Sequence, residues 1–153
     1  MIEITNLQKT FEDSDLTVLK DISLKIEDGD IYGLVGRSGA GKSTLLLCIN
    51  GLTGYQGGSL KVDGCEVKEL SGLRLREFRK NIGMIFQQFS LLERKTVYDN
   101  VALPMECWGW PKQKRDQKVK ELLKLVGLKE EMYVKRGGLG GGEQRRGARA
   151  RAV

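Results

Sequence analysis

Residues 36–44, Gly-Arg-Ser-Gly-Ala-Gly-Lys-Ser-Thr, have the types and spacing of a loop that binds phosphate. They fit the pattern Gly-x-x-x-x-Gly-Lys-Ser/Thr, in which Gly36, Gly41, Lys42 and Ser43 fill the specified positions. Glycines allow the backbone to curl so that successive N–H groups point inward at phosphate oxygens, and the lysine reaches the terminal phosphates. The hydroxyl of Ser43 is placed to ligate Mg²⁺. The alternative is a glycine-rich turn with an incidental lysine.

The flanking sequence supplies the elements that such a loop needs. A short apolar run at residues 31–35 predicts a buried strand before the loop, and residues 41–50 predict a helix after it. The N-terminus of that helix would add its partial positive charge to the phosphate site. We therefore predict that the chain binds a nucleoside triphosphate or descends from a protein that did. The predicted nucleotide-binding residues of the loop are Gly36, Arg37, Ser38, Gly39, Ala40, Gly41, Lys42, Ser43 and Thr44.

The remaining elements change in kind along the chain. Apolar residues at alternate positions predict half-buried strands at residues 2–7 and 21–27, and Asp63-Gly64 predicts the tight turn of a hairpin. A second apolar run at residues 82–86 predicts another buried strand. A strand-rich first half and a helical second half predict an α/β fold with one core and a helical subdomain. The other predicted helices span residues 71–81, 97–107 and 112–126.

Composition narrows the class of protein. The chain has 153 residues, about the length of one domain, and 40% of them are hydrophobic. Of its net charge of +6, residues 129–153 contribute +4 (seven Lys and Arg against three Glu), so we predict no nucleic-acid partner.

With no histidine and three widely spaced cysteines, a zinc site has almost no ligands. No stretch has the roughly 18 apolar residues of a membrane span, so we expect a soluble chain that reaches a membrane only through a partner.

Three stretches resemble the ATP-binding subunits of ABC transporters, most closely those of methionine-type amino-acid importers. They are residues 18–50, 81–104 and 121–128, so the resemblance runs nearly from end to end. It implies an α/β P-loop NTPase, with a RecA-like nucleotide-binding core and antiparallel N-terminal strands over residues 1–87. Part of a helical subdomain is expected over residues 88–153. The resemblance also implies ATP as ligand, Mg²⁺ as cofactor and ATP hydrolysis as the family's activity.

The same resemblance gives roles to two residues outside the loop. Phe11 matches the aromatic residue that stacks on adenine in this family. Gln87 matches a glutamine that touches Mg²⁺ and the attacking water and relays the nucleotide state to the membrane subunit. Lys42 and Gln87 are thereby implied as catalytic residues, and Ser43 and Gln87 as metal contacts. The plainer alternatives are a core aromatic for Phe11 and a surface amide for Gln87. However, α/β sheets place ligand contacts at the carboxyl ends of buried strands, where Gln87 is expected.

The C-terminal residues 139–153, with four glycines and four arginines, have two interpretations. One is a disordered RNA-binding tail. The other is a degraded form of the family's Leu-Ser-Gly-Gly-Gln/Glu signature, which opens a helix and binds the ATP of the partner subunit. RNA-binding arrays repeat Arg-Gly-Gly among aromatic residues, but this chain has one such triplet and no aromatic after Tyr133. We therefore favour the signature, with predicted residues Leu139, Gly140, Gly141, Gly142 and Glu143.

Four departures from the family pattern lie within residues 136–149. Arg136 stands at a usual proline, Gly140 at serine, Gly147 at valine and Arg149 at isoleucine. Loss of a buried hydroxyl contact to ATP would cost about 1–3 kcal/mol. The glycine within the helix would cost about 1 kcal/mol relative to alanine. A charge at a buried helix position is costly unless it is paired.

The resemblance also implies partners and a location. Two such subunits would sandwich two ATPs as a homodimer, dock on an integral membrane permease at the cytoplasmic face of the cell membrane, and serve a substrate-binding protein indirectly. The family's Walker B aspartate, catalytic glutamate and switch histidine have no counterparts in these 153 residues. The apolar runs 31–35 and 82–86 also need more parallel neighbours than these residues supply. We therefore expect a truncated fragment that is inactive alone. The alternatives are a non-catalytic P-loop nucleotide-binding fragment and a basic nucleic-acid-binding protein.

Overall fold

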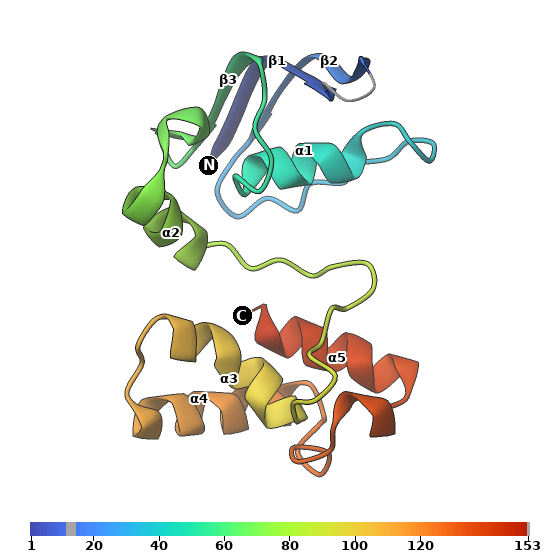
Figure 1. Ribbon diagram of the computed structural model, residues 1–153, viewed down its shortest axis with the longest axis vertical. Helices are drawn as coiled ribbons and strands as arrows, with labels where there is room; N and C mark the ends of the chain where they lie inside the picture. Colours follow the sequence, from blue (N-terminus) through green and yellow to red (C-terminus); the bar gives the residue numbers. More distant parts are fainter. Residues whose placement is uncertain (12–14, 153) are drawn as a thin grey trace. The chain divides into compact units, whose positions relative to one another are not determined.

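The computed structural model describes residues 1–11 and 15–152. It comprises two compact units, Met1–Arg79 and Lys80–Val153, drawn in Figure 1. Each unit has a hydrophobic core of its own. The first combines a sheet with helices and the second is helical, which confirms the predicted α/β class.

The first unit is built on an antiparallel sheet in the order β2-β1-β3-β4. The strands β1 (Ile2–Phe11) and β2 (Leu16–Ile26) confirm the two predicted N-terminal strands and extend beyond them. The hairpin of β3 (Gly57–Val62) and β4 (Cys65–Glu66) is also confirmed. Its turn residues have φ values of 48° at Asp63 and 76° at Gly64, as a tight primed turn requires.

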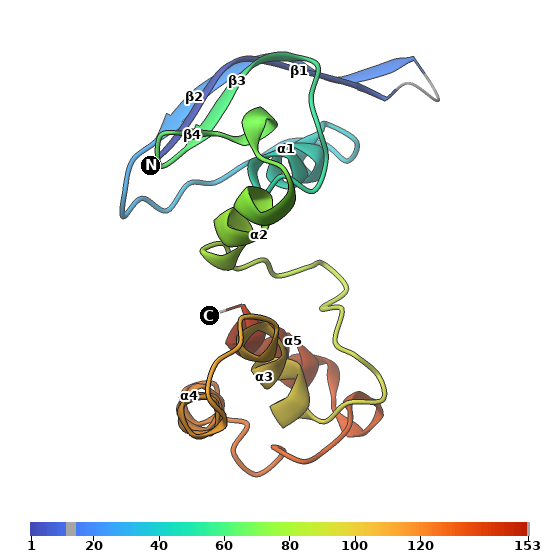
Figure 2. The same cartoon turned by 60° about the vertical axis from the view of Figure 1, so that its left-hand side comes forward.

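One helix covers the inner face of this sheet. Figures 1 and 2 show α1 (Lys42–Ile49) lying across it, where Leu45 and Cys48 pack with Leu7, Leu19 and Leu60. The helix ends at Asn50, and Gly51 takes a φ of 67°, which suits the left-handed residue after a helix. The short helix η2 (Val67–Glu69) and the helix α2 (Gly72–Lys80) follow the hairpin.

The strands predicted at residues 31–35 and 82–86 are absent, and those predictions are wrong for the structure. Both stretches belong to no helix or strand. Ile31 is 102% exposed and Val35 99% exposed, the reverse of a buried strand. The physical reason is that a strand exists only with a hydrogen-bonded neighbour, and neither stretch pairs with any strand in the described part of the chain. Most of their apolar side chains, such as Tyr32, Ile85 and Phe86, are consequently exposed, whereas Leu34 packs against the core of the first unit.

The second unit packs three helices around one core. They are α3 (Val97–Cys107), α4 (Lys112–Leu125) and α5 (Gly141–Arg151), with the short helix η3 (Arg136–Gly138) before α5. The predicted helices 97–107 and 112–126 are confirmed. Thr96 begins α3 with a capping box, because its hydroxyl accepts from the Asp99 N–H while the Asp99 carboxylate accepts from the Thr96 N–H. No helix among residues 1–11 and 15–152 has the length and apolar character needed to cross a membrane.

Candidate functional site

Residues 36–41 form an open loop that leads into α1, whose first three residues are Lys42, Ser43 and Thr44. Residues 36–40 and Ser43 are exposed, whereas Gly41 is buried. The Lys42 side chain turns back over the loop, and its ammonium donates hydrogen bonds of 2.7 Å to the carbonyl oxygens of Gly36 and of Arg37. An ammonium has three N–H donors, so one stays available for a ligand in the loop. The sequence-predicted residues Gly36, Arg37, Ser38, Gly39, Ala40, Gly41, Lys42, Ser43 and Thr44 are thus contiguous around this lysine.

Two glycines give the loop its shape. Gly39 and Gly41 have φ values of 79° and 87°, in the left-handed region where side chains with a Cβ are strained. A Cβ on Gly41 would lie 2.9 Å from Leu19 Cδ2 and 3.0 Å from the Val18 carbonyl oxygen, so β2 closes directly on this residue. The helix α1 starts at the next residue and has no side-chain cap. Its first amides and its dipole therefore face the loop, an arrangement that fits an anion such as a phosphate.

Phe11 lies in the same unit as this loop, at the end of β1. Its side chain is 38% exposed, so the alternative of a core aromatic is not what the structure shows. The Lys9 ammonium lies 4.9 Å from the centre of the Phe11 ring, within the range of a cation–π contact. The ring is therefore partly exposed, with the Lys9 ammonium over it.

Gln87 lies in the second unit, in an exposed turn. The turn is closed by a hydrogen bond of 3.0 Å from the Phe89 N–H to the Phe86 carbonyl. Phe89 and Ser90, which follow it, have φ values of 61° and 49°, although neither is glycine. Gln87 does not end a strand as predicted, because residues 82–86 form no strand.

The predicted signature residues lie at the start of α5, which is an ordered helix and not a disordered tail. Leu139 is buried and Gly140 is the N-cap of the helix. Gly141 and Gly142, its first two residues, are exposed. The Glu143 carboxylate accepts a hydrogen bond of 2.7 Å from the Gly140 N–H. A serine at this position would also supply a hydroxyl for the amides of the first turn, and glycine supplies none. Ala148 and Ala150 are buried in the core of the unit.

The structure accommodates the departures at positions 136, 147 and 149. Arg136 pairs with Glu93 at 2.5 Å on the surface. Gly147 is buried, and a Cβ there would make ordinary contacts of 3.6 Å with Leu91 and 3.8 Å with Leu128. Arg149 is exposed. The expectation that Arg149 places a charge at a buried position is therefore wrong, because this side of α5 faces solvent.

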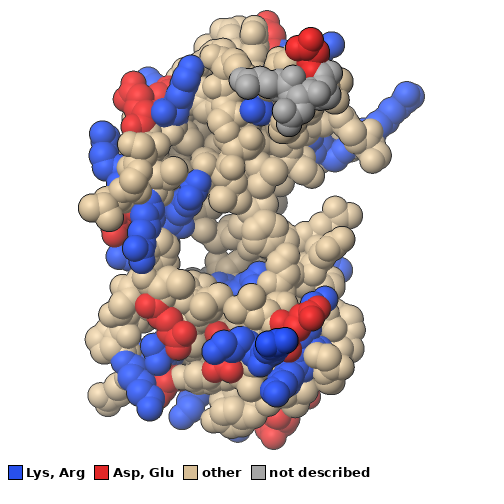
Figure 3. Space-filling model, viewed as in Figure 1, with Lys and Arg blue, Asp and Glu red and all other residues tan. Residues whose placement is uncertain are grey.

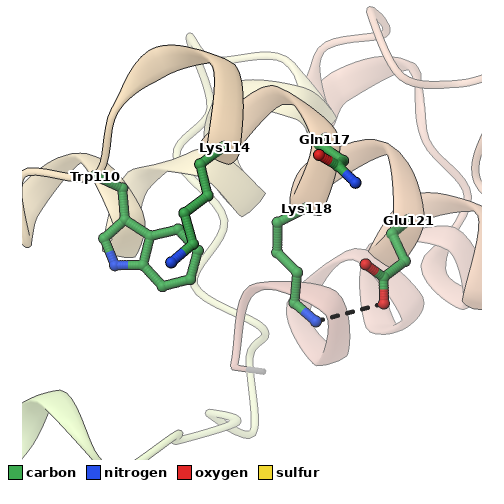
Figure 4. Close-up of a pocket in the computed structure, with 5 residues that line it drawn as sticks. All are labelled: Trp110, Lys114, Gln117, Lys118 and Glu121. Atoms are coloured by element: carbon green, nitrogen blue, oxygen red, sulfur yellow. Dashed lines mark hydrogen bonds and ion pairs between the residues drawn. The ribbon is translucent and has the colours of Figure 1, made fainter.

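A pocket of 340 Å³ on α4 lies apart in sequence from all the predicted site residues (Figure 4). The Lys114 ammonium lies 4.6 Å from the Trp110 ring centre, and Lys118 pairs with Glu121 at 3.5 Å. Its charged groups therefore contact one another or the indole ring. Gln117 completes the lining.

Two polar residues organise the second unit through contacts that the sequence analysis did not predict. Asn100 is buried in α3, and its side chain accepts from the Leu92 N–H and donates to the Leu92 and Thr96 carbonyls, which fixes the turn before α3. Arg151, near the end of α5, donates to the carbonyls of Phe89 and Ser90. No local sequence pattern marks the contacts of Arg151, because its partners lie 61 and 62 residues away in the sequence.

Comparison with known proteins finds relatives across the whole chain. The sequence profile of the ABC transporter family matches residues 19–153. The methionine import ATP-binding protein MetN of Clostridium acetobutylicum is 54% identical over 153 residues, which is the whole of this chain and 47% of that protein. The MetN protein of Vibrio vulnificus is 49% identical over 155 aligned positions, again the whole of this chain and 45% of the relative. The chain thus spans about half the length of these relatives.

Solved structures show the same fold. A dimeric structure of the ATP-binding cassette MJ0796 in a post-hydrolysis state with ADP and Pi superimposes with a TM-score of 0.91. It is 32% identical in sequence, and the match covers all of this chain and 69% of the cassette. A second dimeric structure of this bacterial ABC transporter cassette matches equally well. The superposition confirms the predicted P-loop NTPase fold with its antiparallel N-terminal strands.

Proposed function

This chain belongs to the ABC transporter family, and from that premise we propose that it forms the ATP-binding part of a subunit that powers import of an amino acid. The observation that carries the proposal is the loop at residues 36–44. There the Lys42 ammonium, the left-handed glycines and the uncapped N-terminus of α1 come together around a loop whose residues 36–40 are exposed. Each of these features favours an anion, and together they fit the phosphates of a nucleotide.

ATP is the proposed ligand and Mg²⁺ the proposed cofactor. Lys42 would donate to the terminal phosphates, and the backbone N–H groups of residues 36–44 would surround the others. Mg²⁺ in nucleotide sites keeps several waters and binds phosphate oxygens, so it needs few protein ligands. The Ser43 hydroxyl, which is exposed at the first turn of α1, would supply one of them. Bound Mg²⁺ would neutralise charge on the phosphates, while the residues of this chain position them.

The remaining site residues keep their predicted roles as proposals. Phe11 would stack on adenine, for which its exposed ring is suited. Gln87 would contact Mg²⁺ and, with Lys42, take part in catalysis. Leu139, Gly140, Gly141, Gly142 and Glu143 would contact the nucleotide of a second subunit. Because Gly140 lacks a hydroxyl, we expect that contact to be weaker than one made by serine.

The functional division is proposed at Gln87, with a nucleotide-binding core over residues 1–87 and a helical subdomain over residues 88–153. The compact units divide slightly earlier, after Arg79. A homodimer of these subunits would act on an integral membrane permease from the cytoplasmic face of the membrane, with a substrate-binding protein as an indirect partner. The face of the molecule drawn in Figure 3 carries both blue and red side chains, which does not favour the alternative of a nucleic-acid-binding protein.

Methionine is the proposed substrate class, because the relatives at 54% and 49% identity are named as methionine import proteins. We expect the subunit that contains this chain, reconstituted with its permease and substrate-binding protein, to drive ATP-dependent uptake of labelled methionine into vesicles. The matched control is the Lys42→Ala subunit, which should not drive uptake. Equal uptake with the variant, or uptake of other amino acids only, would contradict the proposal.

The 153-residue chain alone is expected to hydrolyse no ATP above background. The reason is that the Walker B aspartate and catalytic glutamate of the family have no counterpart in it, so that no carboxylate orients the attacking water. The measurement is steady-state phosphate release by the purified chain with ATP and Mg²⁺. Release that disappears in the Lys42→Ala variant would overturn this expectation and place the catalytic groups within residues 1–153. The surviving alternative, a nucleotide-binding protein without catalysis, predicts binding with no uptake.

A further inference from the structure

The last turn of α5 touches the chain on both sides of Gln87. Before Gln87, the backbone of Gly83 approaches the end of α5 so closely that a Cβ on Gly83 would lie 1.9 Å from the Ala152 carbonyl oxygen. After Gln87, Arg151 donates hydrogen bonds of 2.9 Å to the Phe89 carbonyl and 2.7 Å to the Ser90 carbonyl. Arg151 therefore holds the chain just after the exposed turn that carries Gln87, while Ala152, the C-cap of α5, lies closely against Gly83 before it.

The backbone that Arg151 contacts is in an unfavourable conformation. Phe89 and Ser90 both have positive φ values, a region that costs free energy for residues with a Cβ. Two successive residues of this kind expose their carbonyl oxygens side by side. The planar guanidinium offers donors in a fixed fork that can serve both oxygens at once, which the single ammonium of a lysine does less well. Partial burial lowers the pKa of Arg151 from its ordinary value, but an arginine stays protonated at neutral pH.

We propose that Arg151 is a positioning residue for Gln87, setting the orientation of the glutamine by fixing the backbone that follows it. This inference rests on the proposed role of Gln87 at the nucleotide's Mg²⁺. Arg151 itself touches neither nucleotide nor metal in this scheme, since its two observed hydrogen bonds go to backbone carbonyls. The Gly83 contact limits the turn from its other side, where any side chain would collide with the backbone of Ala152.

The test compares Arg151→Gln and Arg151→Lys with Arg149→Gln, which removes the same charge from an exposed position of the same helix. Amide hydrogen exchange is the first readout, on the N–H groups of Phe89 and Ser90, which bond to the Phe86 and Gln88 carbonyls. We expect exchange about tenfold faster or more in Arg151→Gln, because two hydrogen bonds to a charged group are lost, and an intermediate value in Arg151→Lys. Arg149→Gln should match the wild-type chain. Unchanged exchange in Arg151→Gln would overturn the proposal.

The second readout separates positioning from a merely structural role. ATP affinity is measured by calorimetry with and without Mg²⁺ in wild type, Gln87→Ala, Arg151→Gln and the double variant. We expect Arg151→Gln to bind ATP with wild-type affinity in the absence of Mg²⁺. In its presence, Arg151→Gln should lose the same part of the Mg²⁺-dependent gain in ATP affinity as Gln87→Ala. The double variant should lose no more than either single variant. Additive losses, or a loss in Arg151→Gln without Mg²⁺, would overturn the positioning role. If Gln87→Ala behaves as wild type, the proposed role of Gln87 itself is wrong, and the inference that depends on it falls with it.

Discussion

Replacing Lys42 with alanine is expected to weaken ATP binding by about 100-fold or more. The Lys42 ammonium donates to the Gly36 and Arg37 carbonyls and keeps a third donor for the nucleotide. A hydrogen bond between charged partners contributes about 1.5–3 kcal/mol, and a 100-fold change in affinity corresponds to about 2.7 kcal/mol. Loss of the lysine also removes the positive charge that offsets phosphate repulsion. Isothermal titration calorimetry with ATP measures the change directly.

The matched control for this prediction is Lys20→Ala. Lys20 is an exposed lysine of β2, so its loss lowers the net charge equally without altering the loop. Both variants should unfold at nearly the wild-type temperature, since Lys42 forms its hydrogen bonds with exposed carbonyls. An affinity in Lys42→Ala equal to that of Lys20→Ala would refute the assignment of residues 36–44 as a phosphate site.

Local signals in the sequence predicted the elements whose contacts are themselves local. The loop at residues 36–44 and the helix after it follow from glycine spacing and helix pattern, and the hairpin follows from Asp63-Gly64. The strands predicted at the runs 31–35 and 82–86 are wrong for a related reason. Apolar content indicates that a segment favours burial, but it does not show that a strand is present to pair with it. Strand formation depends on a partner distant in sequence, and periodicity carries no information about one.

The site shows the same limit at the level of side chains. The Gly140 N-cap and the helix that follows were predictable from the signature spacing, whereas the exposure of Arg149 was not, because the family's isoleucine suggested a buried face. The pair of hydrogen bonds from Arg151 to the Phe89 and Ser90 carbonyls depends on positive φ values that the residue types at these positions do not predict. Asparagine, aspartate and glycine enter that region most readily, and phenylalanine and serine are poor signals for it.

Gly41→Ala is expected to destabilise the first unit by about 2–5 kcal/mol and to abolish measurable ATP binding. Two costs add at this position. The left-handed backbone at a φ of 87° costs a residue with a Cβ about 1–2 kcal/mol. The added methyl would then lie 2.9 Å from Leu19 Cδ2, 3.0 Å from the Val18 carbonyl oxygen and 3.1 Å from Val18 Cγ1, and overpacking of this kind costs about 1–3 kcal/mol. The Val18 backbone cannot rotate aside as a side chain can, so relief has to come from the loop or from the start of α1.

The control that separates these two costs is Gly29→Ala. Gly29 has nearly the same φ, 85°, but a Cβ there would have no atom within 4 Å, and it lies outside the phosphate loop. We therefore expect Gly29→Ala to lose only the backbone component, about 1–2 kcal/mol, and to keep its affinity for ATP. Urea unfolding of both variants gives the stability difference, and calorimetry gives the affinities. If Gly41→Ala is no less stable than Gly29→Ala and still binds ATP, then β2 does not close on the loop as described, and the positions of its amides do not depend on Gly41.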